Sequence, residues 1–224
     1  MSGLLQSALS GGVLRLTLAD AATRNSLSEA MMATLQAALD AAASDRQVRV
    51  IVLAAEGPAF SSGHNLKEIT AHRADADKGA AYFASLFDAC ARLMLGVVNN
   101  PKPVIAEVAG LASAAGCQLV ATCDLAIASE AARFCTPGVN IGLFCSTPAV
   151  ALTRNVPAKP AFEMLVTGEF ISAQTAENWG LINHAVAPEA LDETVDALCG
   201  KLLATPMPAP PTRRQNMRSS TFGG

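Results

Sequence analysis

The sequence has few charges and no basic cluster, and both absences limit the classes of partner the chain can bind. Only 16% of the 224 residues are charged, the formal net charge is −3, and no run of Lys and Arg is interleaved with aromatic residues. A nucleic-acid-binding surface needs a basic patch or stripe, so we expect no nucleic acid as a partner. Hydrophobic residues make up 51% of the chain, which fits an α/β core or a large subunit interface.

Three kinds of segment are also missing. Residues 1–12 carry no Lys or Arg, so no secretory signal is expected. No apolar run reaches the roughly 18 to 20 residues that span a bilayer, so we expect no membrane partner. The six cysteines form no C-x-x-C pair, which argues against a zinc site and favours reduced thiols. Together these features predict a cytoplasmic protein.

The first third of the chain alternates between strand and helix patterns. Residues 13–18 alternate leucine with other residues, as in a half-buried strand. Ser26 and Glu29 have the spacing of a capping box, and residues 27–42 then trace one apolar helical face. Residues 48–54 are a continuous apolar run that suits a buried parallel strand. This order predicts a βαβ crossover and therefore an α/β fold.

Residues 102–124 contain the pattern most suggestive of a functional site. A β-branched strand pattern is followed by small residues at 112–116 and then by a helical run at 117–123. Free backbone N–H groups at such a helix start favour negative charge, which is the layout of an oxyanion site. A tight strand-to-helix turn in any α/β protein is the alternative. Residues 57–67 form a second small-residue loop after a strand.

Together these segments resemble the crotonase (enoyl-CoA hydratase/isomerase) superfamily, closest to its enoyl-CoA hydratase domain-containing subgroup. The matching pieces are RNSLS at 24–28, AFSSGHNLKE at 59–68, residues 102–129, the turn at 134–137, residues 167–186 and the helix after Pro188. The resemblance implies an α/β spiral of ββα repeats over about residues 10–203, assembled as a homotrimer or a dimer of trimers. It also implies an acyl-CoA thioester as partner and no cofactor beyond the CoA of the substrate.

The resemblance divides the chain into an acyl-CoA-binding domain at 1–203 and a Pro-rich, disordered tail at 204–224, with the family's C-terminal helical part truncated or replaced. It implies that the N–H groups of His64 and Ala115 polarise the thioester carbonyl and stabilise the enolate. Arg24 and Ser26 fall where the family grips the CoA nucleotide. The implied substrate-binding set is Arg24, Ser26, Ser62, His64, Asn65, Leu66, Lys67, Leu111, Ala112 and Gly116.

The match fails where hydratases of the family carry two glutamates. Gln118 and Gly138 occupy those positions. Gln118 is expected to orient water, but an amide cannot accept a proton near pH 7. We therefore expect weak hydratase activity. Decarboxylation or thioester cleavage, a non-catalytic acyl-CoA-binding or assembly role, and a hydrolase using Cys145 or Ser146 stay open as alternatives.

Few other side chains qualify for acid–base chemistry. The imidazole of His64 titrates near neutral pH, but we favour the interpretation that its ring points away and only its amide matters. We interpret Glu107 as a carboxylate that is satisfied by a partner or lies at an edge, rather than as a base. His72 and His184 lack metal-ligand spacing, so no metal site is predicted.

Overall fold

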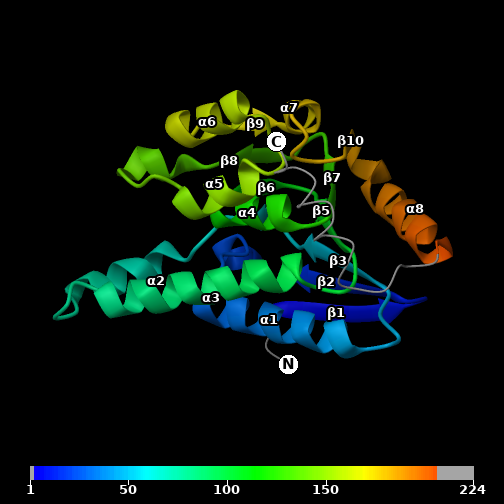
Figure 1. Ribbon diagram of the computed structural model, residues 1–224, viewed down its shortest axis with the longest axis horizontal. Helices are drawn as coiled ribbons and strands as arrows, with labels where there is room; N and C mark the ends of the chain where they lie inside the picture. The colour runs from blue at the N-terminus through cyan, green and yellow to red at the C-terminus, as the bar shows by residue number, and fades with distance from the viewer. Residues whose placement is uncertain (1–2, 206–224) are drawn as a thin grey trace, which may run out of the picture.

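The computed structural model describes residues 3–205, and Figure 1 shows the arrangement of their helices and strands. In this part of the chain, six strands form one sheet in the order β1-β2-β3-β5-β7-β10, and four form a second sheet in the order β4-β6-β8-β9. The larger sheet contains β1 (Leu5–Ser10), β2 (Val13–Leu18), β3 (Val50–Ala55), β5 (Val104–Val108), β7 (Leu125–Ser129) and β10 (His184–Val186). The smaller contains β4 (Ala59–Ser61), β6 (Leu111–Ser113), β8 (Arg133–Cys135) and β9 (Ile171–Ser172).

The chain winds through both sheets as a spiral. Each of the pairs β3/β4, β5/β6 and β7/β8 places its first strand in the larger sheet and its second in the smaller. Neighbouring strands from successive pairs are parallel in both sheets. A helix follows each pair: α2 (Leu66–Ala71), α4 (Ala115–Thr122) and α5 (Ser146–Leu152). The predicted α/β class and its ββα repeat are therefore confirmed.

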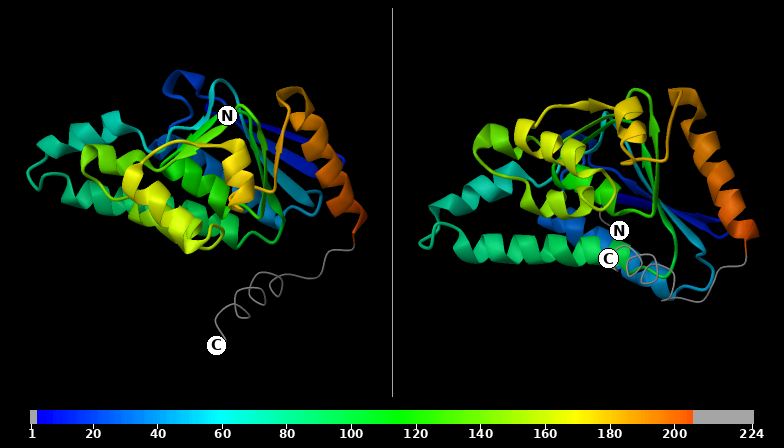
Figure 2. Two further views of the ribbon diagram at one scale, coloured as in Figure 1. Left: turned by 90° about the horizontal axis from the view of Figure 1, so that it is seen from above. Right: turned by 45° about the horizontal axis from the view of Figure 1, so that its top comes forward.

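The alternation of side chains along β3 explains why helices cover both faces of the larger sheet. Ile51 and Leu53 pack into one apolar cluster with residues of α1 (Glu29–Ser44) and α3 (Ala80–Val98). Val50 and Val52 point the other way, into a cluster with residues of α8 (Leu191–Ala204). In Figure 1, α1 and α3 lie side by side, and in both views of Figure 2 the orange α8 lies across the sheet from them. Each such buried side chain contributes about 1.5–3 kcal/mol.

Helix α3 corrects the expectation that no segment has the length and apolarity of a membrane span. It has 19 residues and a mean hydropathy of 1.5 over its most apolar window, which meets that requirement by length and composition. It packs against α1 and α4, however, and its apolar residues Leu86, Leu93 and Val97 are buried in the core. The buried residues make up 33% of this window, whereas Phe87 and Leu95 are exposed.

The capping box predicted at Ser26 is wrong. Ser28, not Ser26, caps α1, because its hydroxyl accepts a hydrogen bond from the N–H of Met31 at 3.2 Å. The hydroxyl of Ser26 instead donates to that of Thr23 at 3.0 Å. At α5, Cys145 takes the cap position without a side-chain bond, and Ser146 is the first helical residue.

Two helices in the last third of the chain have clear ends. Ser172 caps α7 through its hydroxyl, and Gly168 ends α6 in a left-handed conformation. The tail predicted for 204–224 lies outside the described residues except at its first two positions, and α8 continues through the first of these. The other elements are α6 (Ala158–Thr167), α7 (Ala173–Asn178), and 3-10 helices at Ala21–Thr23, His72–Ala74, Pro137–Ile141 and Pro188–Ala190.

Candidate active site

The two small-residue loops singled out in the sequence start side by side. Strands β4 and β6 are parallel neighbours, with Ala59 opposite Leu111 and Ser61 opposite Ala112. Since parallel strands end at the same edge of a sheet, the loop after β4 and the start of α4 after β6 leave that edge together. The topology thus brings the predicted residues His64 and Ala115 into one region.

Two glycines allow these loops to touch. Gly63 has φ +86°, and a Cβ there would lie 3.0 Å from the Cβ of Ala114 and 3.1 Å from the backbone N of Ala115. A Cβ on Gly116 would lie only 2.3 Å from the carbonyl oxygen of Ser61. Side chains at these two positions would push the loops apart, so the glycines are required by close backbone approach.

Among residues 3–205, the backbone N–H groups of His64 and Ala115 donate no hydrogen bond to turns, loops or other elements. Ala115 is the first residue of α4, where a helix has no internal acceptor for its N–H groups. The preceding Ala114 has φ 50° and ψ −118°, a strained conformation of a kind found at functional sites. On the other loop, the N–H of Leu27 donates to the carbonyl of Gly63 at 2.8 Å and holds it in place.

The His64 side chain is partly buried and fixed by an aromatic contact. Its ring meets that of Phe87 edge-to-face, with centroids 5.9 Å apart and planes at 86°. The ring atom Nε2 is buried and has no hydrogen-bond partner in the described part of the chain. Burial lowers the pKa of His64, which favours the neutral imidazole at neutral pH.

Gln118 lies one turn into α4 from Ala115 and is only 7% exposed. Among residues 3–205, its Oε1 is buried without a hydrogen-bond partner. Gln118 can donate or accept a hydrogen bond here, but it carries no proton to transfer.

Gly138 has no room for a side chain. A Cβ there would lie 2.3 Å from the carbonyl oxygen of Leu143 and 2.7 Å from Sγ of Cys145. The N–H of Leu143 donates to the carbonyl of Gly138 at 2.9 Å, which closes this turn. Cys145 is buried, and burial raises the pKa of its thiol although the N–H of Gly138 opposes that shift. Cys145 is therefore a neutral thiol and a weak nucleophile.

The loop that precedes α1 is tied to the loop after β4. The N–H of Ser62 donates to the carbonyl of Arg24 at 3.0 Å, and the hydroxyl of Ser62 donates to the carbonyl of Thr23 at 3.2 Å. Arg24 is exposed and has φ 57°, whereas Ser26 is buried. The structure thus brings Arg24 and Ser62 together beside the candidate site and leaves Ser26 facing inward.

Asn25, which the sequence reasoning missed, holds this loop. It is fully buried, and its Nδ2 donates to the carbonyls of Glu56 at 2.8 Å and Ala59 at 2.7 Å. Its Oδ1 accepts from the N–H of Asp20 at 2.8 Å. The available signal was an asparagine, which tolerates the left-handed region, next to Arg24 in a short loop; its φ is 51°.

The other predicted binding residues divide into structural and exposed ones. Asn65 caps α2, because its Oδ1 accepts from the N–H of Lys67 at 3.0 Å. Leu66 is 59% exposed, and Lys67 is also exposed. Ala112 is completely buried in β6, and Leu111 is half-buried at its start. Leu66 and Lys67 therefore present their side chains to solvent, whereas Asn65 and Ala112 build the framework.

Glu107 is the satisfied carboxylate that the sequence suggested. Both of its oxygens lie 2.5 Å from a guanidinium nitrogen of Arg15. Burial raises the pKa of Glu107, and Arg15 acts in the opposite direction. His72 pairs with Asp75, and His184 lies exposed beside Glu177. Within residues 3–205, no three His, Cys, Asp or Glu side chains form a metal-binding group.

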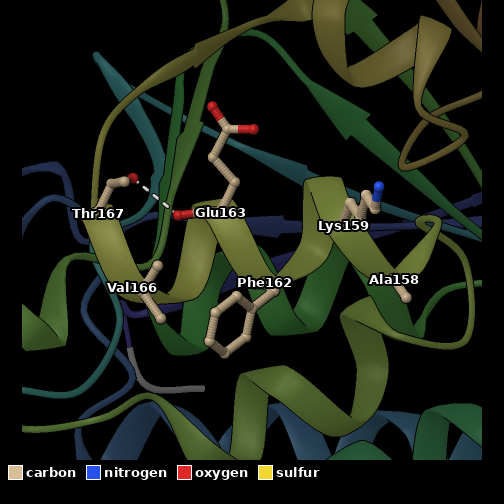
Figure 3. Close-up of a pocket in the computed structure, with 6 residues that line it drawn as sticks. All are labelled: Ala158, Lys159, Phe162, Glu163, Val166 and Thr167. Carbon is tan, nitrogen blue, oxygen red and sulfur yellow. Dashed lines mark hydrogen bonds between the residues drawn. The ribbon is translucent and has the colours of Figure 1, made fainter.

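A groove of about 610 Å³ lies on the outer face of α6, away from all the predicted site residues. Figure 3 shows Phe162 and Val166 on one side of the helix, and Glu163 and Lys159 on the other. The lining is mostly apolar, and Phe162 is 62% exposed. The groove is an apolar surface rather than a second reaction site.

Comparison with known proteins places these observations in a family. The family model described as enoyl-CoA hydratase/isomerase matches residues 8–221. Human enoyl-CoA hydratase domain-containing protein 3, mitochondrial, is 48% identical over 197 residues, covering 88% of this chain and 63% of that protein. The 2,3-dehydroadipyl-CoA hydratase of Escherichia coli strain K12 is 33% identical over 209 residues, covering 93% of this chain and 79% of that protein.

Solved structures agree. An enoyl-CoA hydratase from Mycobacterium smegmatis superposes with a TM-score of 0.91 at 48% identity, covering 99% of this chain and 84% of that one. The crystal structure of human enoyl-CoA hydratase domain-containing protein 3 superposes with a TM-score of 0.91 at 42% identity. The match covers 99% of this chain and 85% of that one.

The curated relatives correct one prediction. Those from human, rat, mouse and Xenopus laevis are named as mitochondrial proteins, which points to the mitochondrion, so the prediction of a cytoplasmic protein is wrong. The chain spans only 62% to 64% of the length of these four relatives. By the family match, the spiral of ββα repeats and the likeness to solved structures, the chain belongs to the enoyl-CoA hydratase/isomerase family and has the crotonase fold.

Proposed function

We propose that this chain binds an acyl-CoA thioester and stabilises its enolate with the N–H groups of His64 and Ala115. The observation that carries the proposal is the contact between the two loops: Gly63 lies against the backbone N of Ala115, and the N–H groups of both proposed donors are unpaired within residues 3–205. Family membership supports the thioester as substrate class.

The physical basis is preorganisation. Two N–H groups held by the backbone do not reorient when negative charge develops on a carbonyl oxygen, and loss of one such donor costs about 3–4 kcal/mol. The strain at Ala114 and the close contact at Gly63 fit loops held in one conformation for this purpose. In this proposal Arg24, Leu66 and Lys67 contact the CoA part of the ligand, since their side chains are accessible.

We expect weak hydration by this chain. Activation of water in hydratases of this kind uses paired carboxylates, and Gln118 and Gly138 occupy the corresponding positions. General acid–base catalysis contributes about 10²–10⁴-fold, so its loss leaves mainly the enolate stabilisation. Enolate reactions without a water-activating base, such as decarboxylation, fit this arrangement. The same observation favours non-catalytic acyl-CoA binding as the second candidate.

We also propose that the chain assembles as a homotrimer or a dimer of trimers. Large exposed apolar side chains are concentrated between residues 141 and 170, which is consistent with a surface that an assembly buries. They are Ile141, Leu143, Phe144, Val150, Phe162, Val166 and Phe170. Light scattering coupled to size-exclusion chromatography gives the oligomeric mass directly, and a monomer at micromolar concentration would contradict this assembly.

Calorimetry tests the proposed binding. The titrants are a short saturated acyl-CoA thioester, the S-alkyl-CoA thioether of the same length, and CoA. We expect the thioester to bind at least about tenfold more tightly than the thioether, since only the thioester carbonyl can accept from the N–H pair; tenfold corresponds to about 1.4 kcal/mol. Equal affinities for the two would exclude carbonyl recognition and leave simple CoA binding.

A further inference from the structure

His64 places two different chemical groups at one position. Its backbone N–H is one of the proposed enolate donors, and its side chain is an imidazole that extends from the same residue. The loop that carries it is anchored at Gly63, whose carbonyl accepts from Leu27. The imidazole therefore has a fixed origin beside the point where the two loops meet.

The ring is held in a way that ordinary packing does not require. The edge-to-face contact with Phe87 fixes its plane. Among residues 3–205, Nε2 is buried without a hydrogen-bond partner. Nε2 thus faces the interior, which leaves Nδ1 as the ring nitrogen for contact with a ligand.

The two carboxylates nearest the loops are already engaged. Glu68 accepts from the N–H of Glu29 and from Nδ2 of Asn65, so its two oxygens are used within the framework. Glu107 is held by Arg15. Cys145 is a buried, neutral thiol beside Gly138. Burial alone accounts for the lowered pKa of His64, with no charged group acting on it.

We infer that the imidazole of His64 is the group that removes and returns the proton at the α-carbon of the bound thioester. The inference rests on the proposed function. Neutral Nδ1 accepts the α-proton, the C–H electron pair becomes the C=C bond of the enolate, and the carbonyl oxygen takes the negative charge against the N–H groups. The imidazolium exchanges this proton with solvent water and then returns a solvent-derived proton to the α-carbon, which restores the thioester. The net result is exchange of the α-proton with solvent.

Isotope exchange tests this step without requiring a complete reaction. The full chain is incubated in D₂O with a saturated acyl-CoA thioester, and deuterium at the α-carbon is followed by NMR and mass spectrometry. Every substitution except proline keeps the backbone N–H at position 64, so His64→Gln separates ring from amide. We expect exchange by the unaltered protein, a reduction of about 100-fold or more in His64→Gln, and calorimetric thioester affinity within about threefold.

His184→Gln is the matched control, because His184 is an exposed histidine on β10. The exchange rate of this variant should stay within about twofold of that of the unaltered protein. His64→Ala with added free imidazole provides a readout that a structural role would not give, since the small base restores exchange only if the ring transfers the proton. If His64→Gln does not fold, as judged by circular dichroism, the His64→Ala experiment decides.

The outcomes separate the two proposals. Equal exchange by the unaltered protein and His64→Gln, or no imidazole rescue, overturns the role of the ring and leaves the backbone donors in place. Thioester binding without any exchange by the unaltered protein also overturns it. Absence of thioester binding by the unaltered protein overturns the proposed function itself.

Discussion

Gly63 faces Ala115 so closely that a Cβ on Gly63 would lie 3.1 Å from the backbone nitrogen of Ala115. This contact joins two loops that are separated by about fifty residues in sequence, and the proposed thioester site depends on it. A change at Gly63 therefore tests whether the contact matters for binding as well as for folding.

Gly63→Ala should lower both stability and thioester affinity. Residue 63 has positive φ, which is unfavourable for alanine, and the added Cβ would lie 3.0 Å from the Cβ of Ala114. We expect a loss of about 1–2 kcal/mol of stability from the backbone conformation alone, and at least about tenfold weaker thioester binding. Gly11→Ala is the control, since Gly11 also has positive φ but nothing lies within 4 Å of a Cβ there. Thermal unfolding and calorimetry measure the two effects; unchanged affinity in Gly63→Ala would contradict the role of this contact.

Asn25→Ala should destabilise the chain strongly. Truncation removes three hydrogen bonds and leaves the buried carbonyl of Ala59 without this donor. At about 1 kcal/mol for each hydrogen bond, we expect a loss of about 3 kcal/mol in urea unfolding. Asn178→Ala, at an exposed position on α7, should change stability by less than about 0.5 kcal/mol. Similar values for the two variants would show that Asn25 does not hold the loop.

Gly138→Glu should not restore hydration, alone or together with Gln118→Glu. The carbonyl of Leu143 lies 2.3 Å from the position of a Cβ at residue 138, so the turn must open before any side chain fits. We expect Gly138→Glu to lower the melting temperature by several degrees, whereas Gly200→Glu, on α8 where none of the described atoms lies within 4 Å of a Cβ, should change it less. A stable double variant with rapid crotonyl-CoA hydration would contradict this steric argument.

Because of His64, we expect the free energy of unfolding to decrease as the pH is lowered. Its pKa is lowered in the folded chain, so the unfolded state binds more protons below the ordinary value of about 6.5. Stability contributed by neutral His64 is complete above that pH and is lost as the pH falls through 6.5 toward the lowered pKa, with a slope of at most about 1.4 kcal/mol per pH unit. Urea unfolding at pH 7.5 and 5.5 should show a larger loss for the unaltered protein than for His64→Gln. Equal losses would contradict a buried, neutral ring.

Much of the fold was predictable because the relevant signals are local. The apolar run of β3, the alternation in β2 and the small-residue start of α4 each depend on neighbours in sequence. The cap of α1 was not predictable in this way: Leu27 forms a bridge with the distant residue His64, and the helix begins only after Ser28.

The site was predictable only in part for the same reason. The positions of the motifs identified His64 and Ala115. The closed turn at Gly138, however, depends on the carbonyl of Leu143. The role of Asn25 depends on the carbonyls of Glu56 and Ala59. Such contacts join residues that no local pattern links.

Isotope-edited infrared spectroscopy tests the central claim most directly. A thioester with a ¹³C-labelled carbonyl is bound to the unaltered protein and to Gly63→Ala, and the carbonyl stretch is compared with that of the same thioester in water. Two converging N–H donors should shift the band to lower frequency in the unaltered protein, and less in the variant. A band at the frequency found in water, from a thioester shown to be bound, would contradict the account.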